Sequence, residues 1–318
     1  MSALDHNAPI LLTGGTGFAG SHLYDLLVER GYTNLHLTSL TGSHTARFPQ
    51  ATVHALDLTN TEATCTLFKQ VHPTAIVHLA SIPTTHDPSL PKLYTLHQNI
   101  AVQDSVLEAM RLHTPTARLL AITSAEVYGH HNQGNTPLTE TTPFTPANEY
   151  AVSKVYQDAL SCQYATEHNL DIVRVRPFNH VGPRQTPHFV VASFAKQIVQ
   201  IENGAQETLQ VGNLDAVRDF TDVRDVVRAY LVLLENGVSG DVYNVGSGVG
   251  ISITSLLDIL REHSRAEISV VQDKARLRPS DNPVMIADVT KLTTLGWQPT
   301  LPLKTTVLDI LAYWREQL

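Results

Sequence analysis

A tyrosine and a lysine four residues apart carry the clearest chemistry in this sequence. Tyr150 and Lys154 lie in a segment of helical composition, and their spacing places both side chains on one face of a helix. A phenol has an ordinary pKa of about 10 and is a poor acid–base group at neutral pH, but a neighbouring ammonium group favours its ionised form. The pair therefore indicates proton transfer, although this spacing alone is more often a solvated helix face.

Ser124 stands where it could take part in the same chemistry. It follows the apolar run Leu119–Ile122, between Thr123 and Glu126. The carboxyl end of a parallel strand opens onto the ligand crevice of an α/β sheet. We therefore expect the Ser124 hydroxyl to hydrogen-bond a substrate oxygen.

A glycine-rich turn near the N-terminus predicts a phosphate site. The sequence Thr13-Gly14-Gly15-Thr16-Gly17-Phe18-Ala19-Gly20 lies between the apolar run Ile10–Leu12 and the helical pattern His22–Glu29. Its spaced glycines allow a tight turn and a close approach of the backbone to a pyrophosphate, which then faces the helix N-terminus. A plain loop is the alternative, but the position between strand and helix favours a dinucleotide site. The Gly-Lys-Ser/Thr sequence of P-loop NTPases is absent.

The end of the second apolar run bears on which nicotinamide cofactor would bind. An acidic residue there binds the free adenosine ribose hydroxyl and repels a 2′-phosphate. Here the run reads Leu37-Thr38-Ser39-Leu40, without an acid. NADP is therefore slightly favoured over NAD, with Ser39 and Arg47 expected near the phosphate.

Short apolar runs alternate with helical patterns through the first 177 residues, which predicts a parallel, doubly wound α/β sheet of the Rossmann type. The expected strands are Ile10–Leu12, Leu35–Leu37, Val53–Leu56, Ala75–Leu79, Leu119–Ile122 and Ile172–Val175. A smaller α/β lobe is expected to contain helices over Val190–Glu202 and Ser255–Glu262, and a further strand is expected at Val242–Val245. We assign 1–177 and 220–246 to the dinucleotide-binding domain, and 178–219 and 247–318 to a substrate-binding lobe.

Composition argues against several other classes of protein. The 318 residues carry a formal net charge of −8 without a run of Lys and Arg, which disfavours nucleic-acid binding. No stretch approaches the roughly 20 apolar residues of a membrane span. Residues 1–9 do not resemble a secretory signal, so a soluble cytoplasmic protein is expected. Cys65 and Cys162 lack metal or disulfide spacing and the 16 histidines are scattered, so no metal site is expected.

The glycine turn, Ser124 and the Tyr150–Lys154 pair together resemble the extended short-chain dehydrogenase/reductase superfamily, over nearly the whole chain. The resemblance implies that Ser124 orients a sugar oxygen and that Tyr150 relays a proton. It implies that Lys154 holds the nicotinamide ribose and lowers the pKa of the tyrosine, and that Asn99 supports the relay. The implied cofactor-binding residues are Gly14, Thr16, Gly17, Phe18, Ala19, Gly20, Ser39, Asp57, Leu58, Leu79, Ala80, Ser81, Asn99, Thr123, Tyr150, Lys154, Pro177 and His180.

Segments in the second half resemble the GDP-mannose branch of the superfamily, which includes the 4,6-dehydratase and the GDP-4-keto-6-deoxymannose reductase. These segments are 176–183, 211–225 and 276–281. Arg218 and Arg278 could place a guanidinium group on each side of a diphosphate, and Lys196 could add a point charge. The implied substrate-binding residues are Ser124, Glu126, Asn179, Val190, Lys196, Arg218, Arg278 and Asp281. The chain departs from the branch at Arg184, where a glycine is expected.

Three functions stay open at this point. The segment 218–225 is closer to the reductase, so reduction of the C4 ketone of GDP-4-keto-6-deoxymannose leads, with Tyr150 as proton donor. Glu126 is also compatible with a dehydratase or epimerase that regenerates its cofactor, because a carboxylate there would remove the C5 proton. A non-catalytic dinucleotide-binding sensor is disfavoured because Tyr150 and Lys154 are both present. The resemblance also implies a homodimer through helices near Gln103–Arg111 and Tyr150–Glu167.

Overall fold

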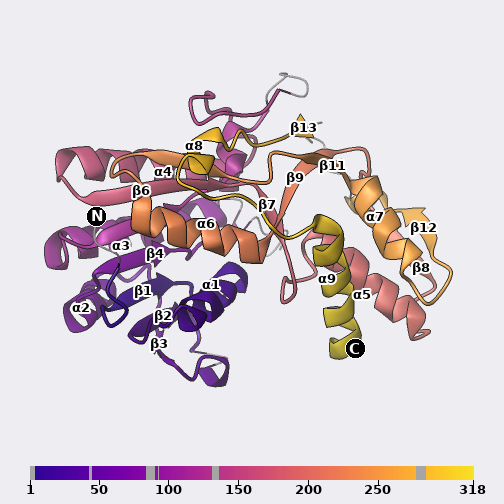
Figure 1. Cartoon of the computed structure of the whole chain (residues 1–318), viewed down its shortest axis with the longest axis horizontal. Helices are drawn as coiled ribbons and strands as arrows, with labels where there is room; N and C mark the ends of the chain where they lie inside the picture. The colour runs from indigo at the N-terminus through magenta and orange to yellow at the C-terminus, as the bar shows by residue number, and fades with distance from the viewer. Residues whose placement is uncertain (1–3, 43–44, 84–89, 92, 131–135, 277–283) are drawn as a thin grey trace.

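A parallel sheet of seven strands forms the larger half of the computed structural model, which describes residues 4–42, 45–83, 90–91, 93–130, 136–276 and 284–318. The strand order is β10-β6-β5-β4-β1-β2-β3 (Figure 1). The bounds are β1 Ile10–Thr13, β2 Leu35–Ser39, β3 Ala51–Ala55, β4 Ala75–His78, β5 Arg118–Ile122, β6 Asp171–Pro177 and β10 Val242–Val245. The predicted doubly wound α/β sheet is confirmed, and the expected strands differ from these only at their ends.

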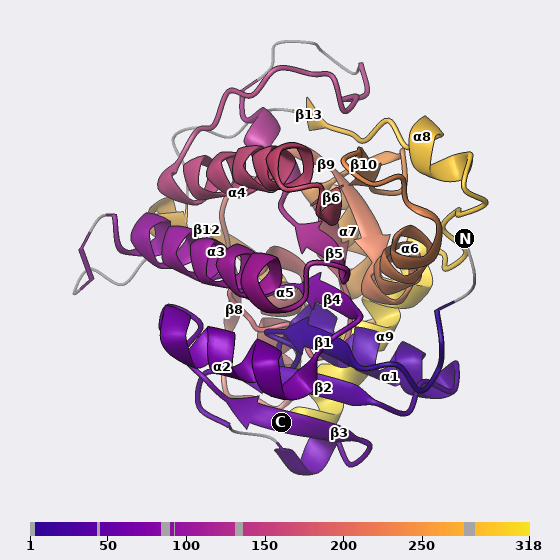
Figure 2. The same ribbon diagram turned by 90° about the vertical axis from the view of Figure 1, so that its left-hand side faces the viewer.

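Helices cover both faces of this sheet because its central strands are apolar on both sides. In β1, Ile10 and Leu12 belong to a core shared with α1 (Phe18–Glu29) and α6 (Val223–Asn236). Leu11 belongs to the opposite core, shared with α2 (Thr61–Val71) and α3 (Tyr94–His113). The helix α4 (Glu149–Glu167) packs beside α3. Figure 2 shows the two helical layers on either side of the strands.

The remaining elements form a smaller lobe, on the right in Figure 1. Its strands are β7 Asn179–Val181, β8 Thr208–Val211, β9 Val217–Asp222, β11 Gly250–Ser252, β12 Ser269–Gln272 and β13 Val284–Met285. β7, β11 and β13 all pair with β9, whereas β8 pairs with β12. Three helices, α5 Val190–Glu202, α7 Ile253–Glu262 and α9 Leu303–Gln317, enclose an apolar core that includes Phe194, Leu256 and Ile310. The expected helix over 190–202 is confirmed, and α7 begins two residues before the expected Ser255.

Short helical elements complete the chain. They are α8 Thr290–Thr293, which packs against β10, and the 3₁₀ turns η1 Thr45–Arg47, η2 Ala125–Tyr128 and η3 Lys274–Arg276.

Three buried aspartates explain much of the segment 218–225. Asp219, Asp222 and Asp225 are each almost fully excluded from solvent and accept hydrogen bonds from distant parts of the chain. Their partners include the backbone N–H groups of Ser247, Gly248, Ala287, Thr300 and Leu301 and the hydroxyl of Thr306. These carboxylates therefore fix how the C-terminal third of the chain crosses β9 and α6.

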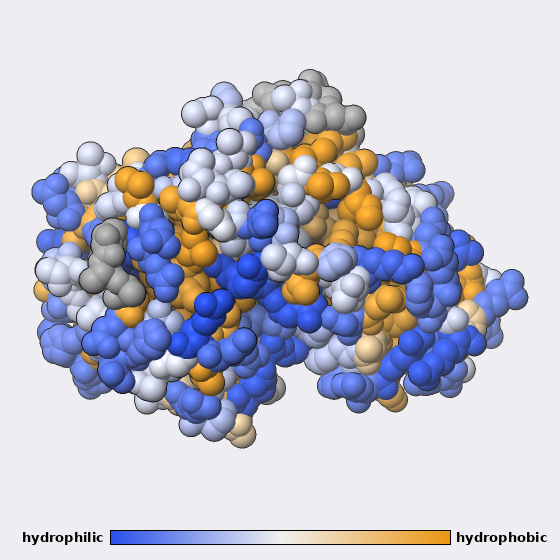
Figure 3. Space-filling model, viewed as in Figure 1, coloured by the Kyte–Doolittle hydropathy of each residue, from blue (hydrophilic) through white to orange (hydrophobic). Residues whose placement is uncertain are grey.

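The molecular surface is hollowed at one edge. Figure 3 shows hydrophobic residues gathered over the middle of one face and a notch between the halves at its lower edge. Among the residues that the structure describes, no helix combines the length and apolar composition that crossing a membrane requires.

Candidate active site

The glycine turn joins β1 to α1 in the geometry of a phosphate site. Gly14 has φ +64°, and a Cβ atom there would lie 2.9 Å from the Cα atom of Ala80, so the turn packs directly on the segment after β4. Gly17 caps α1, which has no side-chain cap and no acidic residue in its first turn. A Cβ atom at Gly17 would have only the carbonyl oxygen of Gly14 within 4 Å among the atoms compared, at 3.2 Å. No side chain caps the N–H groups of the first turn of α1 and no acidic residue stands there, which suits an anion.

The pair Tyr150 and Lys154 faces the carboxyl end of β5. The Lys154 Nζ atom lies 5.5 Å from the centroid of the Tyr150 ring and donates a hydrogen bond of 3.3 Å to the carbonyl oxygen of Ile122. Ser124 caps η2 by accepting a hydrogen bond of 3.1 Å from the backbone N–H of Glu126, and its hydroxyl also hydrogen-bonds Tyr150. The structure thus brings the four predicted catalytic residues together.

Burial sets the protonation of this pair. It raises the pKa of Tyr150 above its ordinary value, and the Glu126 carboxylate adds to this rise, whereas the hydrogen bond with Ser124 opposes it. Burial also lowers the pKa of Lys154 to about 7. The expectation that Lys154 lowers the pKa of the tyrosine stays a prediction, because desolvation and Glu126 set the direction of the shift in the protein alone. Tyr150 is a protonated phenol at neutral pH, which is the form that donates a proton.

Buried polar side chains near Tyr150 and Lys154 link the elements that carry this pair. The Asn99 amide accepts a hydrogen bond of 2.8 Å from the backbone N–H of Ile82 and donates one of 3.0 Å to the Ser153 hydroxyl. Asn99 thus joins α3, α4 and the segment that contains Ser81. Thr123 donates a hydrogen bond of 2.8 Å to the carbonyl oxygen of Val175, which fixes the end of β5 on β6. In this structure the side chains of Asn99 and Thr123 form hydrogen bonds within the protein that position the site.

His78 is a buried neighbour that the sequence pattern did not single out for chemistry. Its Nδ1 atom lies 2.6 Å from the Thr13 hydroxyl, and its Nε2 atom is buried without a partner among the described residues. Burial, with a further contribution from the Lys154 charge, lowers the pKa of His78 to about 3. A neutral imidazole therefore lies close to Lys154.

The residues predicted for the adenine side of the cofactor site lie at the end of β2 and after β3. Ser39 ends β2 and is buried, and Leu58 is also buried. The Asp57 carboxylate accepts hydrogen bonds from the backbone N–H and the hydroxyl of Thr59. Arg47, expected near a 2′-phosphate, instead donates to both carboxylate oxygens of Asp25, at 3.0 and 2.8 Å.

The segment after β6 reaches back to the phosphate helix. The ring of His180 in β7 lies parallel to the ring of Phe18 in α1, with 5.8 Å between their centroids. Pro177 ends β6 and is buried, whereas the neighbouring Asn179 is exposed. The predicted residues of the two halves thus meet at this ring contact.

A cavity of about 380 Å³ lies between α5 and β8 and contains Lys196. It is lined by Pro187, His188, Ser193, Lys196, Gln197, Gln200, Gln206, Thr208, Gln210 and Arg276. The Lys196 Nζ atom also lies 5.6 Å from the Trp314 ring of α9. The sequence interpretation included Arg276 only within the segment 276–281 and did not name the glutamines, because their common wall forms only when α5 packs on β8.

Two other predicted substrate residues, Val190 and Arg218, do not line this cavity. Val190 begins α5, and Arg218 in β9 donates a hydrogen bond of 2.9 Å to the carbonyl oxygen of Val217. Arg278 and Asp281 lie outside the described residues.

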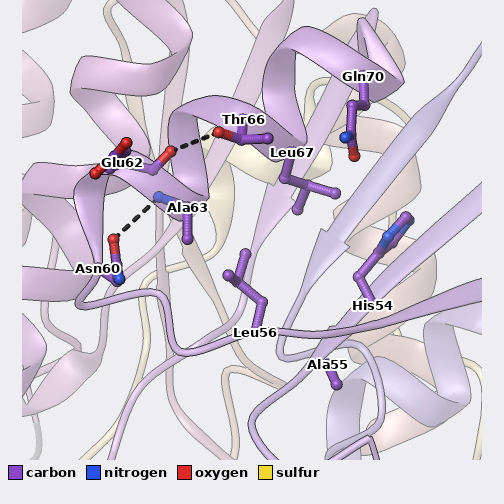
Figure 4. A pocket seen from close by; sticks show the side chains of 9 residues that line it. All are labelled: His54, Ala55, Leu56, Asn60, Glu62, Ala63, Thr66, Leu67 and Gln70. Atoms are coloured by element: carbon purple, nitrogen blue, oxygen red, sulfur yellow. Dashed lines mark hydrogen bonds between the residues drawn. The ribbon is translucent and has the colours of Figure 1, made fainter.

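A second cavity, of about 440 Å³, lies between β3 and α2 and contains none of the predicted site residues (Figure 4). Several of its polar groups are already used to build α2. Asn60 accepts a hydrogen bond from the backbone N–H of Ala63, and Thr66 donates one to the carbonyl oxygen of Glu62. We assign no role to it in the chemistry of the site.

Comparisons with known proteins identify the family of the chain. Residues 11–310 match the family described as GDP-mannose 4,6 dehydratase. The GDP-6-deoxy-D-mannose reductase of Pseudomonas aeruginosa is 33% identical over 310 residues, which cover 97% of each chain. The GDP-6-deoxy-D-talose 4-dehydrogenase of Aggregatibacter actinomycetemcomitans is 28% identical and covers 89% of each chain.

A solved structure shows the same likeness in three dimensions. It is that of RMD from Pseudomonas aeruginosa complexed with NADPH, which has a TM-score of 0.85 and 31% identity and covers 98% of this chain and 100% of that chain. The chain therefore belongs to the GDP-mannose 4,6-dehydratase family of extended short-chain dehydrogenases, as its motifs predict.

Proposed function

We propose that this protein is an NAD(P)-dependent reductase of a nucleotide-linked 4-keto-6-deoxy sugar, converting GDP-4-keto-6-deoxymannose to GDP-rhamnose. The single observation that carries the proposal is the protonated, buried Tyr150 beside Lys154 and Ser124, in a chain that is 33% identical to a GDP-6-deoxy-D-mannose reductase. Reduction of a ketone requires a proton donor, and the raised pKa of Tyr150 keeps this donor loaded at neutral pH.

The dinucleotide would lie across the glycine turn and the end of β5. The turn fits a pyrophosphate because Gly17 has no side chain and α1 begins without an acid or a side-chain cap. When bound, the reduced nicotinamide supplies the hydride that adds to C4 of the sugar. NADPH is proposed as the preferred form, because the end of β2 lacks an acid and the similar solved structure is an NADPH complex.

The side chains of the chain itself would do the rest of the chemistry. Ser124 would hydrogen-bond the ketone oxygen and orient it, and Tyr150 would transfer its hydroxyl proton to that oxygen as negative charge develops. Lys154, whose Nζ atom is held by the carbonyl oxygen of Ile122 at the end of β5, would bind the nicotinamide ribose. On the other side, the sugar nucleotide would occupy the smaller lobe, with Lys196 and Arg218 near its phosphates.

Stoichiometry tests the proposed reduction. Purified protein is given GDP-4-keto-6-deoxymannose with NADPH or with NADH, and the loss of reduced cofactor is followed by absorbance. We expect one reduced cofactor to be consumed for each ketone. No consumption with either cofactor would reject the proposal.

A dehydratase or epimerase is the second candidate, because the Glu126 carboxylate acts on Tyr150 and the matched family is named for a dehydratase. A carboxylate there could remove the C5 proton while the cofactor is regenerated. Incubation with GDP-mannose and no added reductant separates the two functions. Formation of a 4-keto sugar would favour the dehydratase.

We also propose the domain bounds, the location and the assembly of the protein. The dinucleotide domain comprises 1–177 and 220–246, and the substrate lobe comprises 178–219 and 247–318. The protein is a cytoplasmic homodimer that associates through α3 and α4, where Leu112 and Val152 are exposed apolar residues. Light scattering of the purified protein tests the dimer.

A further inference from the structure

Arg184 lies in the chain between β7 and α5 and has an unusual backbone conformation. Its φ is +74°, in the left-handed region that glycine adopts readily and that other residues adopt at a cost of roughly 1 kcal/mol. This conformation explains why a glycine suits the position. The arginine must therefore gain something from its side chain that offsets the backbone strain.

The side chain of Arg184 binds the outer face of α1. Its Nη1 atom donates a hydrogen bond of 2.9 Å to the Asp25 carboxylate, and its Nη2 atom contacts the Nδ1 atom of His22. The Nε2 atom of His22 lies 3.0 Å from the carbonyl oxygen of Pro183. A neutral His22 with its proton on Nε2 donates to Pro183 and accepts from Arg184 at Nδ1, and the Arg184 Nε atom lies 3.2 Å from the same Nε2 atom. Burial lowers the pKa of His22 to about 4, which keeps it neutral. Helix α1 thus holds both the backbone and the side chain of this loop.

The contact between Arg184 and α1 lies between the two proposed ligand sites. α1 begins at the phosphate turn, where Phe18 stacks on His180. In the other direction, Pro187 and His188 follow Arg184 by only a few residues and line the cavity that contains Lys196. Figure 1 shows the chain after β7 passing between α1 and α9.

We propose that Arg184 is a positioning residue that couples binding of the dinucleotide to binding of the sugar nucleotide, by tying the loop after β7 to α1. This inference rests on the proposed function for the identity of the two ligands. A ligand that orders α1 also orders the loop through Arg184. The second ligand then loses less conformational entropy when it binds, because the loop residues that line its site are already positioned. The coupling is reciprocal, because each ligand must strengthen the other by the same factor.

Binding measurements on paired variants test the coupling. The dissociation constant of NADPH is measured by calorimetry with and without saturating GDP, which is the nucleotide part of the proposed substrate. For the unaltered protein we expect GDP to tighten NADPH binding roughly five- to tenfold. Arg184→Gly suits the left-handed backbone and removes only the side chain, so we expect both ligands to bind while the factor falls to about one.

Asp25→Asn weakens the same contact from α1, together with the pair between Asp25 and Arg47, and is expected to lower the factor as well. Arg30→Gln removes an arginine charge at the far end of α1 and should leave the factor unchanged. An equal factor in the unaltered protein, Arg184→Gly and Asp25→Asn would overturn this inference while leaving the proposed function intact. Failure of the unaltered protein to bind NADPH or GDP would overturn both.

Discussion

The Nζ atom of Lys154 lies 5.5 Å from the centre of the Tyr150 ring, and both side chains are held at the end of β5. Burial lowers the pKa of this lysine to about 7, so its ammonium charge is half lost near neutral pH in the free protein. The charged form exists below that pH and disappears above it. Because the charged form would bind the cofactor ribose, binding of NADPH must take up a proton as the pH rises.

We therefore expect the dissociation constant of NADPH to increase by about tenfold between about pH 6 and about pH 8.5. Fluorescence titration of the cofactor measures this directly. In Lys154→Met the affinity should be weaker and should not depend on pH in this range. Equal affinity of the unaltered protein across the range would show that the lysine charge does not contribute.

The sequence predicted the parts of the fold and site that depend on local patterns. Continuous apolar runs identified the buried strands, since both faces of β1 are covered by helices. The four-residue spacing of Tyr150 and Lys154 placed both on one face of α4. Strand ends were less predictable, because hydrogen-bond pairing with neighbours decides where a strand stops.

Contacts between distant segments could not be predicted in this way. Arg184 and Asp25 are 159 residues apart in the chain, and His78 lies near Lys154 because β4 and β5 are neighbours. Segment 218–225 was interpreted through Arg218, whereas its aspartates anchor distant backbone. The rise in the pKa of Tyr150 follows from burial, which a linear pattern does not contain.

Asp158 continues the face of α4 that carries Tyr150 and Lys154, and it is a second testable feature. Its buried carboxylate accepts hydrogen bonds of 2.8 Å from both Arg174 and Arg176. Asp158→Asn would leave buried guanidinium charge without its counter-charge, so we expect the free energy of unfolding to fall by about 3 kcal/mol. Urea denaturation measures the change.

Arg261 provides the matched comparison for this ion pair. It pairs with Asp258 at 3.7 Å on an exposed surface of α7, so Arg261→Gln should change the free energy of unfolding by less than about 0.5 kcal/mol. Equal effects of the two substitutions would mean that the buried network does not hold α4 in place.

Gly129 ends the turn that carries Glu126. Its φ is +54°, and a Cβ atom there would lie 1.6 Å from the carbonyl oxygen of Thr145, which is backbone and cannot move aside alone. We expect Gly129→Ala to lower the free energy of unfolding by at least about 2 kcal/mol and to reduce turnover by displacing Glu126. Gly204 has φ +71° with no atom within 4 Å of an added Cβ, so Gly204→Ala should cost only about 1 kcal/mol. Similar losses in the two variants would contradict the close contact with Thr145.

The phenol hydroxyl of Tyr150 is the group on which the proposed reaction depends. Tyr150→Phe keeps the ring against Lys154 and removes only the transferable proton. Consumption of NADPH in the presence of GDP-4-keto-6-deoxymannose should fall by about 10²- to 10⁴-fold, while the dissociation constant of NADPH changes by less than about threefold. A Tyr150→Phe protein that reduces the ketone as fast as the unaltered protein would contradict the account.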